Sequence, residues 1–220
     1  MTLNVAIVGT GIFATDAHLP TIKKLDNLKL VACYNRSKDK AEKFASQADI
    51  PADHVYESLE QIFEDKLIDF VDVLLPAQYN LNAVRLAAKN KKPIVFEKPI
   101  AANLDQAAEI VKIAREESIP IGVLENWSFR KSVKVLKEQF LPKIGDVVSF
   151  TYRYTGPWKE SNKYLATLWR QNPEHIGGFL SDGGVHQLAF LTGILGNVES
   201  VSALTKQIRP EAGDVDTLFS

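Results

Sequence analysis

A glycine-rich turn between an apolar strand pattern and a helical pattern constrains the fold of this chain more than any other feature. Val-Ala-Ile-Val at residues 5–8 is followed by Gly-Thr-Gly-Ile-Phe-Ala at residues 9–14. This order fits the Gly-x-Gly-x-x-Gly/Ala fingerprint of a dinucleotide-binding turn, in which a helix N-terminus meets the pyrophosphate. A purely structural turn is the alternative, since turns use glycine for many reasons. The predicted cofactor contacts here are Gly9, Gly11, Ile12 and Phe13.

Strand and helix patterns continue to alternate through the first half of the chain. Further apolar strands are predicted at residues 28–34, 70–75, 94–96 and 121–124. Near-continuous apolar strands are typical of parallel sheets that are covered by helices on both faces. Ser-Leu-Glu-Gln at residues 58–61 and Asn-Leu-Asp-Gln at residues 103–106 mark helix starts. We therefore predict an α/β fold, a doubly wound parallel Rossmann sheet, over residues 1–126.

The second half has a different pattern. A basic amphipathic segment at residues 131–139 predicts a linking helix, and residues 146–155 alternate as a strand would. A helix is predicted from about residue 185 to 195, and a strand from about residue 198 to 208. Two strands make a poor sheet alone. Residues 127–220 are therefore predicted to form the first part of an α+β domain with a mainly antiparallel sheet, for substrate binding or oligomerisation.

The end of the second predicted strand bears on the choice of nicotinamide cofactor. Asn-Arg-Ser-Lys at residues 35–38 occupies the place where NAD enzymes usually carry an acidic residue for the ribose 2′-hydroxyl. A guanidinium can instead hold a 2′-phosphate through a forked hydrogen bond. The sequence therefore predicts NADP(H) as cofactor, bound by Asn35, Arg36, Ser37 and Lys38. The alternative is that Arg36 and Lys38 are solvated charges at a helix start that Ser37 caps.

Polar side chains also follow the later strands of the predicted sheet. Leu75, Pro76 and Asn80 come after the third long strand, and a Glu-Lys-Pro triplet containing Glu97 and Lys98 ends the next one. Ligands of open α/β sheets bind along this carboxyl edge. The proline restricts the backbone of Lys98 and helps to fix its direction. A surface lysine is the ordinary interpretation of Lys98 taken alone.

The second half carries one dense motif, Gly-Gly-Phe-Leu-Ser-Asp-Gly-Gly-Val-His at residues 177–186. Asp182 and His186 are four residues apart, so they share one face if a helix has begun by Asp182. A helix N-cap aspartate and a hydrogen-bonded core histidine are the ordinary interpretations of these two residues. Their combination with the glycine turn favours a functional role.

Together these motifs resemble the Gfo/Idh/MocA oxidoreductases (glucose-fructose oxidoreductase, inositol dehydrogenase and their relatives). The glycine turn, the Glu-Lys-Pro triplet, Trp169-Arg170 and the Asp-Gly-Gly-Val-His motif match in order and spacing over the whole chain. The likeness is greatest to fungal members described as NADP(H)-dependent. It implies hydride transfer between a nicotinamide and a carbonyl or hydroxyl carbon of a sugar, a polyol or a related small molecule. It also implies that Lys98 and His186 face the substrate and that Asp182 supports them.

The resemblance suggests a role for each residue. Hydride transfer to a carbonyl builds negative charge on its oxygen, so Lys98 is predicted to supply a positive field. His186 is predicted to donate or accept the proton, because its ordinary pKa lies near neutrality. Asp182 would orient the imidazole or bind a substrate hydroxyl. Further predicted cofactor contacts are Leu75, Pro76, Asn80, Glu97, Lys98, Asn126, Trp169 and Arg170.

Aromatic residues are concentrated between residues 150 and 169. Such side chains stack on sugar rings, and they are also enriched at interfaces between subunits. Sheet packing or an interface is predicted for Phe150, Tyr152 and Tyr154. Trp158 and Tyr164 are predicted substrate contacts.

Two other functions compete with this hypothesis. A catalytically silent, dinucleotide-sensing regulator can have the same fold, but such relatives are expected to lose the triplet lysine or the motif histidine, and both are present. A metal hydrolase could use His175, Asp182 and His186, yet their spacing matches no tight ligand motif. An enzyme without a metal is therefore predicted.

The chain departs from the family pattern in three ways. Ala189 occupies a position where relatives often have Asp, and Asn80 stands where many have His. Most members are also longer, so this chain is expected to be a fragment or to lack part of the second-domain sheet. That sheet is where a homo-oligomer would be expected to form.

The composition agrees with an enzyme that acts on a small molecule. The net charge of −1 gives no electrostatic reason to expect nucleic acid or an acidic membrane surface as partner. No apolar run approaches the roughly twenty residues of a membrane span, and the N-terminus shows no secretion signal. Cys33 lies in an apolar run and is predicted to be a core residue. A cytoplasmic enzyme with a small-molecule substrate is expected.

Overall fold

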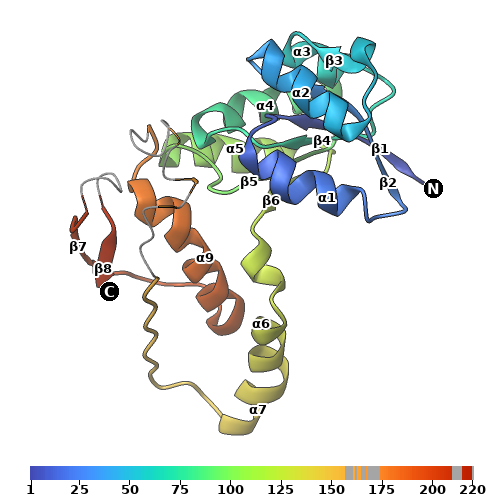
Figure 1. The fold of residues 1–220 in the computed structure, drawn as a ribbon. Helices are drawn as coiled ribbons and strands as arrows, with labels where there is room; N and C mark the ends of the chain where they lie inside the picture. The colour runs from blue at the N-terminus through green and yellow to red at the C-terminus, as the bar shows by residue number, and fades with distance from the viewer. Residues whose placement is uncertain (157–160, 162, 165–166, 168–173, 210–214, 220) are drawn as a thin grey trace. The chain divides into compact units, whose positions relative to one another are not determined.

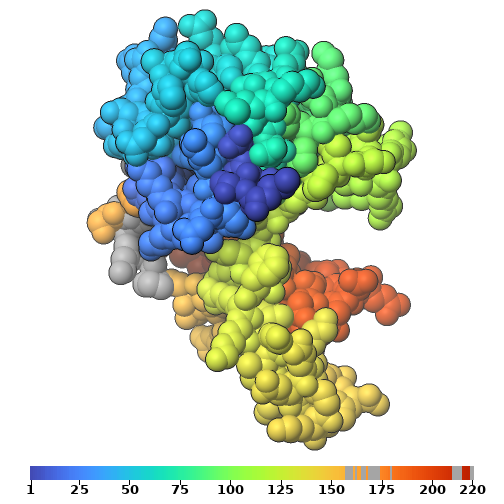
Figure 2. Space-filling view, turned by 90° about the vertical axis from the view of Figure 1, so that its right-hand side faces the viewer, coloured from blue at the N-terminus to red at the C-terminus, as the bar shows by residue number. Residues whose placement is uncertain are grey.

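The computed structural model describes residues 1–156, 161, 163–164, 167, 174–209 and 215–219. The chain divides into two compact units, residues 1–124 and residues 125–220. The division falls at the end of the sixth strand. The first residues of the chain lie on the surface of unit 1, where dark-blue atoms are in full view (Figure 2).

Unit 1 is built on a six-stranded parallel sheet (Figure 1). The strand order is β3-β2-β1-β4-β5-β6. Successive strands are added on one side of β1 up to β3 and on its other side from β4 onward, so the strand order reverses between β1 and β4. This is the order of a Rossmann sheet, and it confirms the predicted fold class. The two-residue edge strand β3 is an addition to the five strands that the sequence predicts. The strands are β1 (Leu3–Val8), β2 (Leu28–Tyr34), β3 (Val55–Tyr56), β4 (Phe70–Val73), β5 (Ile94–Glu97) and β6 (Ile121–Leu124).

Helices cover both faces of this sheet. Successive side chains of a strand point to opposite faces, and β1 follows this rule. Val5 and Ile7 pack in the apolar cluster with α1 and α2, whereas Ala6 and Val8 pack in the cluster with α3, α4 and α5. The helical segments are η1 (Ala14–His18), α1 (Leu19–Ile22), α2 (Lys38–Ala48), η2 (Ala52–His54), α3 (Leu59–Glu64), η3 (Ala77–Tyr79), α4 (Asn80–Asn90) and α5 (Leu104–Glu116).

The predicted helix starts are confirmed by their caps. The backbone N–H of Gln61 donates to the Ser58 hydroxyl, and the Gln61 side chain accepts from the Ser58 N–H, so that the capping box is complete. Ahead of α5, the Asn103 side chain accepts from the N–H of Gln106 at 2.9 Å. Each cap satisfies backbone donors that the helix itself leaves without partners.

Cys33 lies in the core of unit 1, as the sequence predicts. Its side chain is fully buried in β2, and its thiol donates to the carbonyl oxygen of Ala41 at 3.6 Å. Burial raises the pKa of this thiol to about 12.

Unit 2 consists of a run of helical segments, a longer helix and a short antiparallel pair of strands. The predicted linking helix at residues 131–139 is confirmed, and α9 begins seven residues earlier than predicted. No helix in the described parts of either unit is long and apolar enough to cross a membrane. The elements are η4 (Asn126–Phe129), α6 (Lys131–Val135), η5 (Leu136–Phe140), α7 (Leu141–Ile144), α9 (Gly178–Leu195), β7 (Leu204–Lys206) and β8 (Thr217–Phe219).

The strand predictions in unit 2 need correction. Residues 146–155 form no strand, and Val148 and Phe150 in this segment are exposed. A strand is stabilised by hydrogen bonds to a neighbouring strand, and none of the described residues pairs with this segment. The strand predicted at residues 198–208 is confined to β7, because only these three residues pair with β8. No strand was expected from the sequence at the position of β8.

Candidate functional site

The glycine turn after β1 has a geometry that suits a dinucleotide. Gly9 has φ +92°, and a Cβ at this position would lie 2.5 Å from the carbonyl oxygen of Leu74, so no other residue fits without rearrangement. A Cβ on Gly11 would meet no described atom within 4 Å. Open space beside Gly11 is what a pyrophosphate needs in order to approach the backbone. Ile12 and Phe13 follow the turn and are each 37% exposed.

A hydrogen-bond chain ties this turn to the end of β2. The Asn35 amide donates to the Thr10 hydroxyl at 2.8 Å, and that hydroxyl donates to the carbonyl oxygen of Lys40 at 3.1 Å. The Asn35 side-chain oxygen also accepts from the N–H of Ser37 at 3.4 Å. Asn35, a predicted cofactor contact, therefore connects the two loops that would hold the cofactor.

Arg36 lies beside the ring of Tyr79, a residue that was not a predicted cofactor contact. The guanidinium carbon is 5.8 Å from the ring centroid, and Nη1 donates to the Tyr79 hydroxyl at 3.4 Å. Arg36 follows β2 and Tyr79 follows β4, so the contact spans the loop after β1, which lies between these strands in the sheet. A cation over an aromatic face gains electrostatic stabilisation. Tyr79 therefore holds the Arg36 guanidinium at the carboxyl edge of the sheet.

The other two residues of this segment are arranged differently. Lys38 forms a 3.5 Å ion pair with Glu57, and both side chains are largely exposed. Ser37 occupies the N-cap position of α2, but its side chain makes no cap hydrogen bond. The alternative in which Ser37 caps the helix is thus correct in position but not in hydrogen bonding.

Asn80 is fully buried and fixes the turn that contains Lys98. Its amide nitrogen lies 3.2 Å from the carbonyl oxygen of Pro99 and 3.3 Å from that of Ile100. A longer contact of 3.4 Å reaches the carbonyl oxygen of Glu97. The Lys98–Pro99 peptide bond is cis. Asn80 therefore holds the backbone of the Glu-Lys-Pro triplet. Leu75 and Pro76 follow β4 at the same edge of the sheet.

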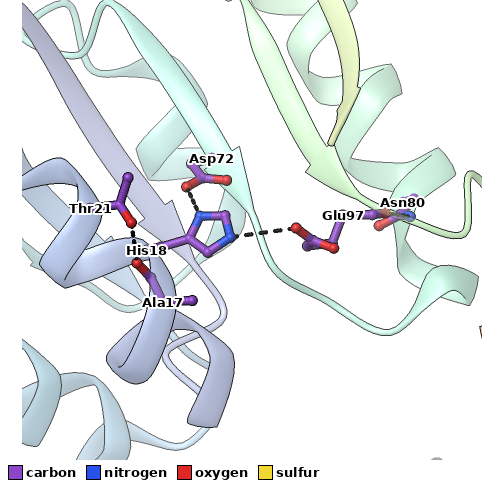
Figure 3. A network of polar contacts seen from close by, with 6 residues as sticks. All are labelled: Ala17, His18, Thr21, Asp72, Asn80 and Glu97. Atoms are coloured by element: carbon purple, nitrogen blue, oxygen red, sulfur yellow. Dashed lines mark hydrogen bonds and ion pairs between the residues drawn. The ribbon is translucent and has the colours of Figure 1, made fainter. Parts of the chain in front are cut away.

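A histidine lies between two carboxylates that belong to strands β4 and β5 (Figure 3). His18 Nδ1 lies 2.6 Å from Asp72 Oδ2 on β4, and His18 Nε2 lies 3.5 Å from Glu97 Oε1 at the end of β5. The three side chains are only 14%, 6% and 17% exposed. Burial by itself lowers the pKa of His18, but the hydrogen bonds to Asp72 and then to Glu97 outweigh it and raise this pKa to about 9. His18 is therefore an imidazolium at neutral pH. Neither His18 nor Asp72 was a predicted site residue.

This histidine predicts a loss of stability at alkaline pH. The pKa of about 9 in the folded chain exceeds the ordinary value of 6.5. The charged His18 side chain therefore contributes fully to the free energy of unfolding below about pH 6.5. This contribution, of up to about 3 kcal/mol, is lost as the pH rises to about 9. Urea denaturation at pH 6.5 and pH 9 should show this difference. In a His18→Asn variant the free energy of unfolding should change much less over the same interval. An equal change in both proteins would contradict the assignment.

In unit 2 the predicted His186 is held by Glu125 and Trp127. Its Nδ1 lies 2.7 Å from Glu125 Oε1, which also accepts from the N–H of Trp127 at 2.9 Å. The indole of Trp127 stacks on the imidazole with ring centroids 5.5 Å apart and planes at 17°, and the Arg130 guanidinium lies 3.2 Å from the Trp127 ring centroid. Asp182 was predicted to orient His186, but the carboxylate that the structure places on Nδ1 belongs to Glu125.

Asp182 and His186 both lie within α9, so their four-residue spacing places them on one face of a helix. The Tyr152 hydroxyl donates to Gln187 of the same helix. The predicted sheet packing of Phe150, Tyr152 and Tyr154 is wrong, because residues 146–155 form no strand, and the alternative of an interface stays a prediction. Asn126 lies in η4 beside the residues that hold His186. The Tyr164 carbonyl oxygen accepts from the Thr167 hydroxyl at 2.6 Å. Three predicted site residues lie outside the described part of the chain: Trp158, Trp169 and Arg170.

The metal-hydrolase alternative finds no support in the described residues. His175 Nε2 lies 3.1 Å from the carbonyl oxygen of Gly178, and His186 Nδ1 lies against Glu125. Among the side chains that the structure describes, no group of three His, Cys, Asp or Glu residues is arranged to hold a metal ion.

Comparison with known proteins agrees with this geometry. A family model described as an oxidoreductase family with an NAD-binding Rossmann fold matches residues 3–124, and the model of the same family's C-terminal alpha/beta domain matches residues 140–220. An uncharacterized protein of Saccharomyces cerevisiae, YMR315W, is 56% identical over 219 residues, which are 99% of this chain and 62% of that protein. The dehydrogenase FPY6 of Fusarium mangiferae is 32% identical over 99% of this chain and 66% of its own length.

A solved structure shows the same relationship. An oxidoreductase from Thermotoga maritima superimposes with a TM-score of 0.87 and 33% identity, over 99% of this chain and 67% of that one. The chain thus spans about two thirds of the length of these relatives. Both family models, the identities and the fold agree with the motifs in unit 1 and unit 2. The chain belongs to the Gfo/Idh/MocA family of oxidoreductases.

Proposed function

We propose that this chain is part of an NADP(H)-dependent oxidoreductase. It transfers hydride between the nicotinamide and a carbonyl or hydroxyl carbon of a sugar, a polyol or a related small molecule. The observation that carries the proposal is the Arg36 guanidinium, which Tyr79 holds beside the open glycine turn. An NAD enzyme would place a carboxylate at this strand end, and a carboxylate would repel a 2′-phosphate.

The residues of unit 1 fit this cofactor. The open backbone at Gly11 would face the pyrophosphate, and the guanidinium of Arg36 would bind the 2′-phosphate. Ser37 contributes a hydroxyl that makes no cap hydrogen bond and lies in the same segment. When bound, NADP(H) supplies or accepts the hydride, which is chemistry that side chains cannot perform.

In unit 2, His186 would move the proton. Because a carboxylate can only accept a hydrogen bond, Glu125 keeps the Nδ1 proton in place and leaves Nε2 as the reactive nitrogen. During oxidation, Nε2 takes the proton of the substrate hydroxyl as the carbon gives up its hydride. During reduction, Nε2 returns that proton to the carbonyl oxygen. Lys98 would stabilise negative charge on the same oxygen.

An Arg36→Ala variant is expected to bind NADPH about 10- to 100-fold more weakly than the unmodified chain. This is the loss of one charge-assisted hydrogen bond, worth roughly 1.5–3 kcal/mol. The affinity for NADH, which has no 2′-phosphate, should be almost unchanged. Fluorescence titration with each cofactor measures both dissociation constants.

The matched control is Lys38→Ala, which removes a nearby charge that is exposed and paired with Glu57. It should alter the ratio of the two dissociation constants much less. A ratio that stays constant in Arg36→Ala would contradict the NADP(H) preference. If the unmodified chain bound neither cofactor, the whole proposal would be wrong.

A further inference from the structure

The sheet topology determines which half of unit 1 would lie under each end of the dinucleotide. A Rossmann sheet binds one nucleotide half on each side of the reversal in strand order. Arg36 follows β2, so the half formed by β1, β2 and β3 would take the adenosine with its 2′-phosphate. The nicotinamide end would then extend over the half formed by β4, β5 and β6.

The buried histidine cluster lies in this second half. Asp72 is the third of the four residues of β4, and Glu97 is the last residue of β5. His18 reaches both carboxylates from η1, the helical segment that follows the glycine turn (Figure 3). Its ring also lies at 65° to the Phe13 ring, with centroids 5.1 Å apart. His18 thus connects the turn, β4 and β5 through one side chain.

Within the cluster formed by His18, Asp72 and Glu97, negative groups outnumber positive ones. Two carboxylates face one imidazolium, and Asp72 Oδ1 is buried without a hydrogen-bond partner in the described structure. A buried carboxylate requires a cation or hydrogen bonds to remain charged. His18 provides both, and without its charge the cluster would become more negative at the carboxyl edge of β4 and β5.

We propose that the His18 bridge sets the relative affinity of this chain for the oxidised and the reduced cofactor. The inference rests on the proposed NADP(H) site. The oxidised nicotinamide ring carries a positive charge and the reduced ring is neutral, so a more negative surrounding favours the oxidised form. By offsetting part of the charge of Asp72 and Glu97, His18 favours NADPH over NADP⁺.

Two substitutions separate the charge of His18 from its hydrogen bonds. His18→Asn places an amide nitrogen near the position of Nδ1 and can still donate to Asp72. His18→Gln places one near the position of Nε2 and can still donate to Glu97. Both variants lack the positive charge, so both should change the affinities in the same direction. Thermal denaturation of each variant shows whether it is folded.

The measurement is the ratio of the NADP⁺ and NADPH dissociation constants, determined by calorimetry and fluorescence titration at pH 8. A unit charge acting across roughly 10 Å of protein is worth about a factor of ten in an equilibrium constant. In both variants the NADP⁺ dissociation constant should therefore fall about tenfold relative to that of NADPH. This change corresponds to roughly 30 mV in the potential of the bound couple. Lys24→Gln removes an exposed positive charge just beyond α1 and should leave the ratio unchanged.

Several outcomes would overturn the inference. If both dissociation constants changed by the same factor, His18 would only support the fold. A shift in one variant alone would assign the effect to a hydrogen bond instead of the charge. Nitrogen-detected NMR of the unmodified chain should show both ring nitrogens of His18 protonated at pH 7.5, and a neutral ring would exclude the mechanism. Unmodified chain that bound neither cofactor would refute the proposed function itself, which is a distinct result.

Discussion

Replacing Gly9 by alanine is expected to lower the free energy of unfolding by roughly 3–5 kcal/mol. The new Cβ would lie 2.5 Å from the carbonyl oxygen of Leu74 and 2.9 Å from its carbonyl carbon, which belong to the backbone and cannot rotate away. The φ of +92° adds strain, because residues other than glycine rarely adopt it. Urea denaturation followed by circular dichroism measures the change through the midpoint at constant slope.

Gly11→Ala is the matched control for this prediction. Its Cβ would meet no described atom within 4 Å, so the free energy of unfolding should change by less than about 0.5 kcal/mol. The added methyl group would instead occupy the space beside the backbone and should weaken NADPH binding. The two glycines thus separate folding from binding. A stable Gly9→Ala protein with normal NADPH affinity would contradict the prediction, because it would show that the turn after β1 tolerates a side chain at residue 9.

Replacing His186 by alanine is expected to lower kcat by a factor of about 10² to 10⁴, the range attributed to general acid–base catalysis. The assay would use a substrate found by screening sugars and polyols with NADP⁺. The dissociation constant of NADPH should stay within about twofold, because His186 is proposed to move the proton and is not a proposed cofactor contact. Glu125→Gln keeps a hydrogen-bonding side chain beside Nδ1 and should have a smaller effect on kcat, together with a changed pH profile.

His54→Ala serves as the control for this second prediction, since it removes a histidine of η2 that is not a proposed site residue. It should retain full turnover. Full turnover in His186→Ala as well would refute the proton-transfer role. Loss of turnover in Glu125→Gln without a change in pH profile would indicate that Glu125 acts only on the fold.

The sheet of unit 1 could be predicted because each long strand carries its own signal. Buried parallel strands are apolar over their whole length, and capped helices separate them. The edge strand β3 has two residues, which is too short for a periodic pattern. In unit 2, alternation at residues 146–155 predicted a strand, yet alternation cannot show whether a neighbouring strand is present to pair with it. The local sequence pattern was therefore enough to predict strands in unit 1, where the alternation of strands and helices also implies which strands pair.

The candidate site was predictable to a similar extent. Glycine spacing and Arg36 were enough to predict a cofactor turn, since their chemistry is local. The bridge of His18 and Asp72 depends on residues 54 positions apart, and only the charge of Asp72 within an apolar strand hinted at it. Glu125 follows the last strand of unit 1, a position that could have drawn attention. Its bond to His186 joins residues 61 positions apart, and no spacing rule predicts such a contact.

The buried sulfur of Cys33 makes this chain convenient for site-directed spectroscopy. The thiolate is the reactive form of cysteine, and a thiol with a pKa of about 12 inside the core forms almost none of it. The chain has no other cysteine. Fluorophores or spin labels carried by maleimide would therefore attach to a pair of cysteines introduced on the surface, one in each unit, while the native one stays inert. Distances between the two units could then be measured without first removing Cys33.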